Sequence, residues 1–255
     1  MHQLTIVKIG GKIVENSESL TTFLKDFNLI VGDKILIHGG GRSATDLAEK
    51  LGVETKMTNG RRITDAEMLK VVIMVYAGLV NKNIVAQLQK LQMDAIGLSG
   101  ADINLILSQK RPVKDINYGF VGDIKEINAP ALLDLLKQNY LPVIAPITHD
   151  GNGNLLNTNA DTIAAEIAKA MAFDYNVRLI YCFEKKGVLL NEADEKSCIP
   201  VLDFESFQQY KTEGIIQGGM IPKLDNAFQA IASGVKEVII TCASEVNTGK
   251  GTYIQ

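Results

Sequence analysis

Short apolar runs rich in β-branched residues alternate along the whole chain with segments of helical periodicity. Most of these runs are continuously apolar, which is typical of parallel strands covered on both faces. The alternation predicts an α/β fold, a three-layer α/β/α sandwich around a central, mostly parallel sheet. At 255 residues the chain can bury a large core, and we expect a single domain, 1–255, with its main strands in one sheet. The expected strands are residues 4–9, 34–38, 95–98, 141–145, 177–183 and 237–241, and the expected helices are 17–29, 43–51, 65–91, 129–139, 161–172 and 223–233.

Two stretches interrupt the alternation and are predicted to form hairpins. One covers residues 112–125 with a turn at Asn117-Tyr-Gly119, and the other covers 149–154, where Asp-Gly and Asn-Gly pairs favour tight turns. The helix from Asp65 to Leu91 is long and has a wide apolar face, which indicates burial in the core alone or in the core and a subunit interface. Thr64-Asp-Ala-Glu67 has the form of a capping box at its start.

Composition and charge exclude several classes of function. A net charge of -3 provides no basic field for nucleic acid. The three cysteines and three histidines show no metal-ligand spacing, so we expect reduced thiols and no metal site. A strand begins at Leu4, which leaves no room for a signal peptide, and the longest apolar run, 71–80, is shorter than the roughly 20 residues of a membrane span. We expect a cytoplasmic protein that binds neither nucleic acid nor membrane.

Two glycine-bearing segments follow expected strands in the N-terminal half. Lys8-Ile-Gly10-Gly11 ends the first strand, so Lys8 lies at the carboxyl edge of the sheet, where α/β proteins bind ligands, although a surface lysine before a turn would give the same pattern. His38-Gly39-Gly40-Gly41 lies between a strand and a helix, and its backbone N–H groups beside the helix N-terminus favour an anion site over a plain turn. Its spacing is not that of a dinucleotide-binding loop.

Two further motifs lie in the C-terminal half. Asn157-Thr-Asn159-Ala-Asp161 leads into a helix; helix capping explains Asn159 and Asp161 but leaves Asn157 unexplained. Gly218-Gly-Met-Ile-Pro-Lys223 also leads into a helix, and the loop 184–189 follows a strand. Together these features indicate phosphoryl transfer without a P-loop, with two lysines stabilising the transferred group. If a carboxylate is the nucleophile, with a reference pKa of about 4.3, no general base is required.

Six motifs in order resemble the acetylglutamate kinase branch of the amino acid kinase family over essentially the whole chain. They are Lys8-Ile-Gly-Gly, His38-Gly-Gly-Gly, Asn59-Gly-Arg-Arg-Ile-Thr64, Gly97-Leu-Ser-Gly-Ala-Asp102, Asn157-Thr-Asn-Ala-Asp161 and Gly219-Met-Ile-Pro-Lys223. The resemblance implies the amino acid kinase fold, with residues 1–173 binding an acylated glutamate and dimerising, and residues 174–255 binding ATP. It implies ATP-dependent phosphorylation of the side-chain carboxylate of N-acetyl-L-glutamate, the second step of arginine biosynthesis, with Mg²⁺ accompanying ATP and no tightly bound cofactor.

The resemblance also implies roles for individual residues. Lys8 and Lys223 would stabilise the transferring phosphoryl group, Asp161 would hold both lysines, and Gly11 and Gly41 would donate backbone N–H bonds. The substrate would be bound by Gly40, Gly41, Arg62 and Asn157. The nucleotide would be bound by Gly10, Gly11, Glu184, Lys186, Gly187, Gln217, Gly219 and Lys223.

Departures from the family pattern leave some points open. Phe183-Glu-Lys-Lys186 replaces a Thr-Asp-Val loop of many relatives, and Ala101 replaces a usual lysine. With the first strand expected to start at Leu4, we expect no N-terminal helix like that of arginine-inhibited hexamers. We therefore expect a homodimer through the helix from Asp65 to Leu91, without strong arginine feedback. An N-succinyl substrate is the alternative, with Lys56 or Arg61 as the cation for its extra carboxylate. A non-catalytic sensor would be expected to lose Lys8, Asp161 or Lys223, which are all present.

Overall fold

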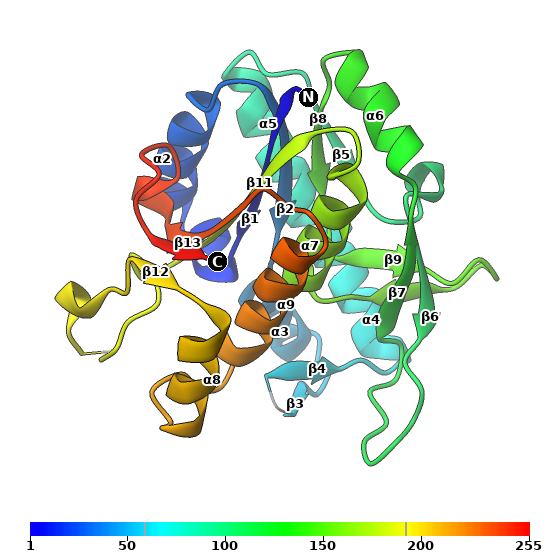
Figure 1. Cartoon of the computed structure of the whole chain (residues 1–255). Helices are drawn as coiled ribbons and strands as arrows, with labels where there is room; N and C mark the ends of the chain where they lie inside the picture. Colours follow the sequence, from blue (N-terminus) through cyan, green and yellow to red (C-terminus); the bar gives the residue numbers. More distant parts are fainter. Residues whose placement is uncertain (59, 192) are drawn as a thin grey trace.

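An eight-stranded sheet runs through the centre of the molecule (Figure 1). The computed structural model describes residues 1–58, 60–191 and 193–255. The strand order is β12-β14-β13-β11-β1-β2-β8-β5, and all neighbouring strands are parallel except β13 and β14. The predicted three-layer α/β fold with a mostly parallel sheet is therefore confirmed. The strands are β1 (Gln3–Ile9), β2 (Asp33–His38), β5 (Ala95–Leu98), β8 (Leu141–Ile144), β11 (Asn176–Phe183), β12 (Val201–Leu202), β13 (Glu237–Cys242) and β14 (Thr252–Ile254).

Each face of the sheet packs against its own layer of helices. In β1, Leu4 and Ile6 belong to one hydrophobic core, whereas Val7 and Ile9 belong to the other, because successive side chains of a strand point to opposite faces. The first core is closed by α6 (Ala129–Lys137), α7 (Ala160–Met171), α8 (Phe204–Thr212) and α9 (Met220–Ala232). The second is closed by α2 (Ser17–Asn28), α3 (Gly41–Lys50), α4 (Ala66–Ile73) and α5 (Asn81–Lys90), with the short α1 (Gly11–Glu15) beside them.

Hairpins lie beside the main sheet at both predicted places, but the first differs from the prediction: only 122–125 of its predicted residues are in a strand, and 112–121 form its loop. β6 (Ile106–Lys110) pairs antiparallel with β7 (Gly122–Ile127), and β9 (Ile147–His149) pairs antiparallel with β10 (Leu155–Asn157), all four in one small sheet. A further hairpin of β3 (Lys56–Thr58) and β4 (Arg61–Ile63) was not predicted. Neither were α1, α8, β12 and β14, which are short or have weakly periodic sequences.

The long predicted helix is present but contains a π-helical segment. α4 continues without a break into η1 (Met74–Val80) and then into α5. By length and composition alone, Ala66–Lys90 is apolar enough to span a membrane, a test that core helices of soluble proteins also pass. Met68, Val72, Ile84 and Leu88 on this helix are fully buried in the second core, so we interpret it as a core helix.

The predicted capping box at the start of this helix was wrong. The N-cap is Asp65, whose side chain accepts a hydrogen bond from the Met68 N–H at 2.9 Å. Thr64 instead bonds across the molecule: its N–H donates to the Tyr118 carbonyl and its own carbonyl accepts from the Phe120 N–H. A tertiary contact therefore displaces the local motif, and it brings the loop of the β6–β7 hairpin against the end of β4.

Candidate active site

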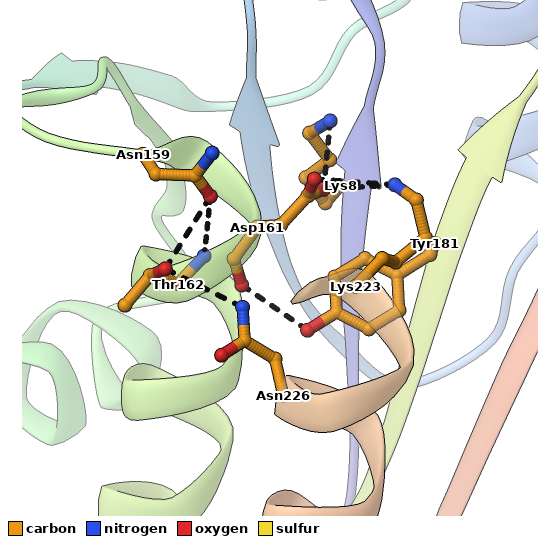
Figure 2. Close-up of polar contacts among 7 residues, drawn as sticks. All are labelled: Lys8, Asn159, Asp161, Thr162, Tyr181, Lys223 and Asn226. Atoms are coloured by element: carbon orange, nitrogen blue, oxygen red, sulfur yellow. Dashed lines mark hydrogen bonds and ion pairs between the residues drawn. The ribbon is translucent and has the colours of Figure 1, made fainter. Parts of the chain in front are cut away.

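Asp161 lies between two lysines at the carboxyl edge of the main sheet (Figure 2). Its Oδ1 is 2.8 Å from the Lys8 Nζ, and its Oδ1 and Oδ2 are 3.1 Å and 3.2 Å from the Lys223 Nζ. Lys8 comes from the end of β1, Asp161 from the first turn of α7, and Lys223 from the first turn of α9. Three segments distant in the sequence therefore form one buried cluster, as predicted.

Attraction between the opposite charges of this cluster offsets the cost of burying them. Burial disfavours the carboxylate of Asp161, but the charges and hydrogen bonds of Lys8 and Lys223 outweigh it and hold the pKa of Asp161 well below its usual range. Burial lowers the pKa of Lys223, which the charge of Asp161 partly offsets. Asp161 is therefore ionised at neutral pH, and its carboxylate lies against both ammonium groups.

Side chains around the cluster fix its members in place. The Tyr181 hydroxyl donates to the Asp161 carbonyl at 3.1 Å, and the Lys223 Nζ lies 5.2 Å from the centre of the Tyr181 ring and 5.8 Å from that of Phe183. Asn159 caps α7 by accepting from the Thr162 N–H at 2.9 Å. Tyr181 was not predicted, because in the sequence it is one more member of an apolar strand.

A cavity of about 260 Å³ opens beside the cluster. The glycine loops after β1 and β2 line it, and the N–H groups of Gly11, Gly40 and Gly41 have no acceptor among the described residues. Such free donors beside the N-terminus of the ten-residue α3 suit a carboxylate or phosphate. The predicted site residues that line the cavity are Lys8, Gly11, Gly40, Gly41, Arg62, Asn157 and Asp161.

Arg62 and Asn157 are held at the wall of this cavity by polar contacts. Arg62 is buried, and its Nη2 donates to the Gly41 carbonyl at 2.7 Å and to the Thr45 hydroxyl at 2.8 Å. Asn157 donates through Nδ2 to the Thr64 hydroxyl at 2.9 Å. The guanidinium therefore has a fixed orientation beside the glycine loop, as is needed for planar recognition of a carboxylate.

Two further arginines line the cavity, and only one of them was anticipated. Arg61 lies on its wall, whereas Lys56, which the sequence offered as an alternative cation, does not line it. Arg111, from the loop after β6, also lines the cavity and donates through Nε and Nη2 to Asp123 at 2.9 Å and 2.6 Å. The lining thus holds four cationic side chains and one acidic one, Asp161, which suits an anionic ligand.

The residues predicted to bind nucleotide do not meet at one point. Glu184 and Lys186 line a separate groove of about 550 Å³ beside α1 and α2, where Glu184 forms an ion pair with Lys12.

Gly187 is buried, and a Cβ there would lie 2.5 Å from the Cys198 Sγ, which gives this glycine a packing role. Gln217, which bonds to the Gly214 carbonyl, and Gly219, the N-cap of α9, are exposed. Their contact with nucleotide stays a prediction.

Metal ligands are not clustered in the part of the chain that the structure describes, where no group of three or more His, Cys, Asp or Glu side chains could hold an ion. The three cysteines are free thiols.

Asn59, the first residue of the Asn59–Thr64 motif, lies outside the described residues. The other members of that motif, from Gly60 to Thr64, are described, and Gly60 lines the cavity.

Comparison with known proteins identifies the family of the chain. The profile of the amino acid kinase family matches residues 3–242. An acetylglutamate kinase from Parabacteroides distasonis is 62% identical over 254 residues, which cover 100% of both chains. The crystal structure of smu.665 from Streptococcus mutans has a TM-score of 0.83 and 28% identity, covering 99% of this chain and 98% of that one. A carbamate kinase from Giardia lamblia bound to AMP-PNP shares the fold alone, with a TM-score of 0.73, 13% identity, and coverage of 98% and 97%.

These matches define the class of protein. The chain belongs to the amino acid kinase family. Within that family it is an enzyme of the acetylglutamate kinase type, a phosphotransferase with a carboxyl group as acceptor. The resemblance of the motifs to this family is therefore confirmed, while the roles of single residues remain predictions.

Replacing Lys223 by Met tests its predicted role. The variant keeps most of the apolar stem but removes a charge beside the transferred group, so we expect kcat to fall about 10²–10³-fold, the usual cost of losing one such electrostatic contact. The measurement is steady-state turnover, together with circular dichroism to verify folding. Lys236→Met, at an exposed lysine, is the control. Near-normal turnover of a folded Lys223→Met enzyme would contradict the role.

Replacing Asp161 by Asn tests the charge coupling through pH. Because the folded pKa of Asp161 is lowered below its unfolded value of about 3.9, its ionised form stabilises the fold above that pH, and the benefit is lost as pH falls further. We expect the variant to be less stable by about 3 kcal/mol at pH 7. That difference should stay constant down to about pH 5 and shrink below about pH 4.

The measurement for this variant is urea unfolding at stepped pH. Asp134→Asn, at an exposed aspartate on α6, is the control and should change stability little at every pH. A difference between wild type and Asp161→Asn that grows on acidification would have the wrong sign for a paired carboxylate.

Proposed function

We propose that the enzyme transfers the γ-phosphoryl group of ATP to the side-chain carboxylate of N-acetyl-L-glutamate. The observation that carries the proposal is the cluster of Lys8, Asp161 and Lys223 beside a cavity lined by free backbone donors and arginines. The high identity to acetylglutamate kinases over the full length supports the choice of substrate.

The reaction needs charge stabilisation more than proton transfer. The bond between the γ-phosphorus and the bridging oxygen to the β-phosphate breaks, a bond from that phosphorus to a carboxylate oxygen forms, and ADP leaves. The acceptor, with a reference pKa of about 4.3, is ionised at neutral pH and needs no general base. Negative charge spreads over the transferred group during the reaction. We assign the stabilisation of this charge to Lys8, Lys223 and the N–H of Gly11.

The acceptor substrate carries two carboxylates, which the cavity can accommodate separately. We assign the α-carboxylate to Arg62 and Asn157, because Arg62 presents a guanidinium of fixed orientation in the cavity lining. The side-chain carboxylate then points toward Lys8 and the glycine loops. Mg²⁺ enters with ATP, since magnesium in phosphotransferases keeps water and substrate phosphates as ligands.

The biological setting follows from the substrate. We propose that the acyl phosphate is an intermediate of arginine biosynthesis and that the enzyme works in the cytoplasm. The three free thiols support a reducing compartment. No observation favours an N-succinyl substrate over the acetyl one, so the succinyl compound serves as a comparison in the test below.

The substrate assignment predicts a clear order of reactivity. With acyl phosphate trapped by hydroxylamine, we expect N-acetyl-L-glutamate to give the highest kcat/KM. Free L-glutamate should react about 10–200-fold less efficiently, because it lacks the acyl contacts and adds an ammonium group to a cationic cavity. Preference for N-succinyl-L-glutamate would keep the reaction and change the acyl group, whereas no ATP-dependent product with any of the three would contradict the proposal.

We also propose a homodimer formed through Ala66–Lys90. Met74 and Leu79 on this helix are 50% and 57% exposed, with the partly buried Leu69, Ile73 and Ala77 around them. A second copy placing the same face against this one would remove that apolar surface from water.

The dimer is tested by sedimentation equilibrium. Wild type should have twice the chain mass of 27.8 kDa, and the double variant Met74→Glu/Leu79→Glu should have the mass of one chain, because burying two carboxylates per subunit opposes association. Leu51→Glu, at a leucine 55% exposed directly after α3, is the control and should stay dimeric. A monomeric wild type, or a dimeric double variant, would refute this interface.

A further inference from the structure

His38 is a fully buried histidine directly before the glycine loop of the cavity. Its Nδ1 lies 2.8 Å from the Gly39 carbonyl oxygen, and its Nε2 lies 3.2 Å from the Asn81 Nδ2. A carbonyl only accepts hydrogen bonds, so the Nδ1 carries the proton and the Nε2 accepts from the Asn81 amide. Burial lowers the pKa of His38 to about 4, so the ring is neutral under working conditions.

Asn81 is held in the orientation that this tautomer needs. It is buried, its Nδ2 also donates to the Val143 carbonyl at 2.9 Å, and its Oδ1 accepts from the Lys82 Nζ at 3.2 Å. A Cβ on Gly97 would lie 2.0 Å from that Oδ1, so the glycine leaves room for the amide. Every polar atom of the two side chains therefore has a partner.

The bond to Gly39 determines which way the next peptide group faces. In a trans peptide the C=O and the following N–H point in opposite directions, and the chain has no cis peptide among its described residues. Because the Gly39 carbonyl points at His38, the N–H of Gly40 points the other way. That N–H has no acceptor among the described residues, and Gly40 lines the cavity.

We propose that His38 and Asn81 are positioning residues that hold the Gly39–Gly40 peptide so that the Gly40 N–H faces the cavity as a fixed anion donor. Without the donor on His38, rotation of this peptide would turn a carbonyl oxygen toward an anionic substrate. The part of this inference that concerns catalysis rests on the proposed function, and the peptide orientation does not.

The π-helical segment gives the long helix its contacts with this loop. The ring of Tyr76, inside η1, packs against Gly40, and a Cβ at that position would lie 3.0 Å from the Tyr76 Cδ1. Asn81 is the first residue after η1. π-Helical segments occur frequently at functional sites. In this helix the π-helical segment brings two side chains to the glycine loop. Tyr76 packs against Gly40, and Asn81 acts through its bond to His38.

Nuclear magnetic resonance tests the tautomer in the wild-type enzyme. The chain has three histidines, so their ring nitrogens can be assigned in long-range ¹H–¹⁵N spectra at pH 7. We expect His38 to be neutral with the proton on Nδ1. In Asn81→Asp, which has the same shape, the carboxylate accepts instead of donating, so Nε2 should take up a second proton and His38 should become doubly protonated. An Nε2-protonated or doubly protonated His38 in the wild type would overturn the proposal.

Turnover tests the consequence for catalysis. His38→Leu should lower kcat about 100-fold, the smaller of the losses in kcat that follow removal of one anion donor. The KM for ATP should change less than about twofold. His38→Asn keeps a donor at the place of Nδ1 and should recover most of that loss. His2→Leu, at an exposed histidine, is the matched control.

The outcomes separate the two proposals. Wild-type enzyme inactive on all N-acylated glutamates would refute the proposed function, while the tautomer measurement still tests the peptide orientation. An active wild type with an equally active, folded His38→Leu variant would refute the positioning role alone. If His38→Leu does not fold, the comparison of wild type with His38→Asn and the tautomer measurement decide the question.

Discussion

The site depends on one carboxylate that neutralises two neighbouring lysines. In general, two like unit charges about 4 Å apart repel each other by about 4 kcal/mol at the effective dielectric of a protein surface, and more when water is excluded. Asp161 offsets this repulsion with oxygens within 3.2 Å of both nitrogens. Lys8 and Lys223 can then remain buried and charged before any substrate arrives, each with about a tenth of its side chain exposed.

This pairing also ties the two halves of the sheet to each other. β1 lies at the centre of the strand order, with the N-terminal strands on one side and β11 and β13 on the other. Lys8 on β1 and Lys223 on α9 meet at Asp161, which comes from α7 between them in the sequence. A phosphoryl group transferred across this junction would meet charges that are already in position, so little reorganisation is needed during the reaction.

Most of the fold could be predicted from the sequence because its strands are continuously apolar and its helices have clear periodicity. The site could be predicted as far as it depends on strand ends, since the carboxyl ends of parallel strands meet at one edge. That rule brought Lys8 and Gly40 to one cavity, whereas the place of Asp161 came from the family resemblance, because it follows β10 of the small antiparallel sheet. Arg111 and Tyr181 were missed because their roles depend on partners distant in the sequence, Asp123 across a hairpin and Asp161 on another element.

Local motifs were reliable only where no tertiary contact competed with them. Asn159 caps α7 as its sequence indicates. Thr64 has an equally good capping sequence, yet its backbone pairs with the loop of the β6–β7 hairpin and its hydroxyl accepts from Asn157, so Asp65 caps the helix instead. The same contacts hold Asn157 at the lining of the cavity, to which Arg62 also belongs.

The helix that begins at this cap connects the cavity to the exposed apolar face of the molecule. Its buried side contacts the glycine loop through Tyr76 and Asn81, while Met74 and Leu79 lie exposed on the same π-helical segment. π-Helical turns are rare and occur mostly as single-turn interruptions of α-helices. A second copy packed on the exposed side would therefore restrain the segment that positions the anion donors, and dimer formation and the geometry of the loop would be coupled through seven residues of one helix.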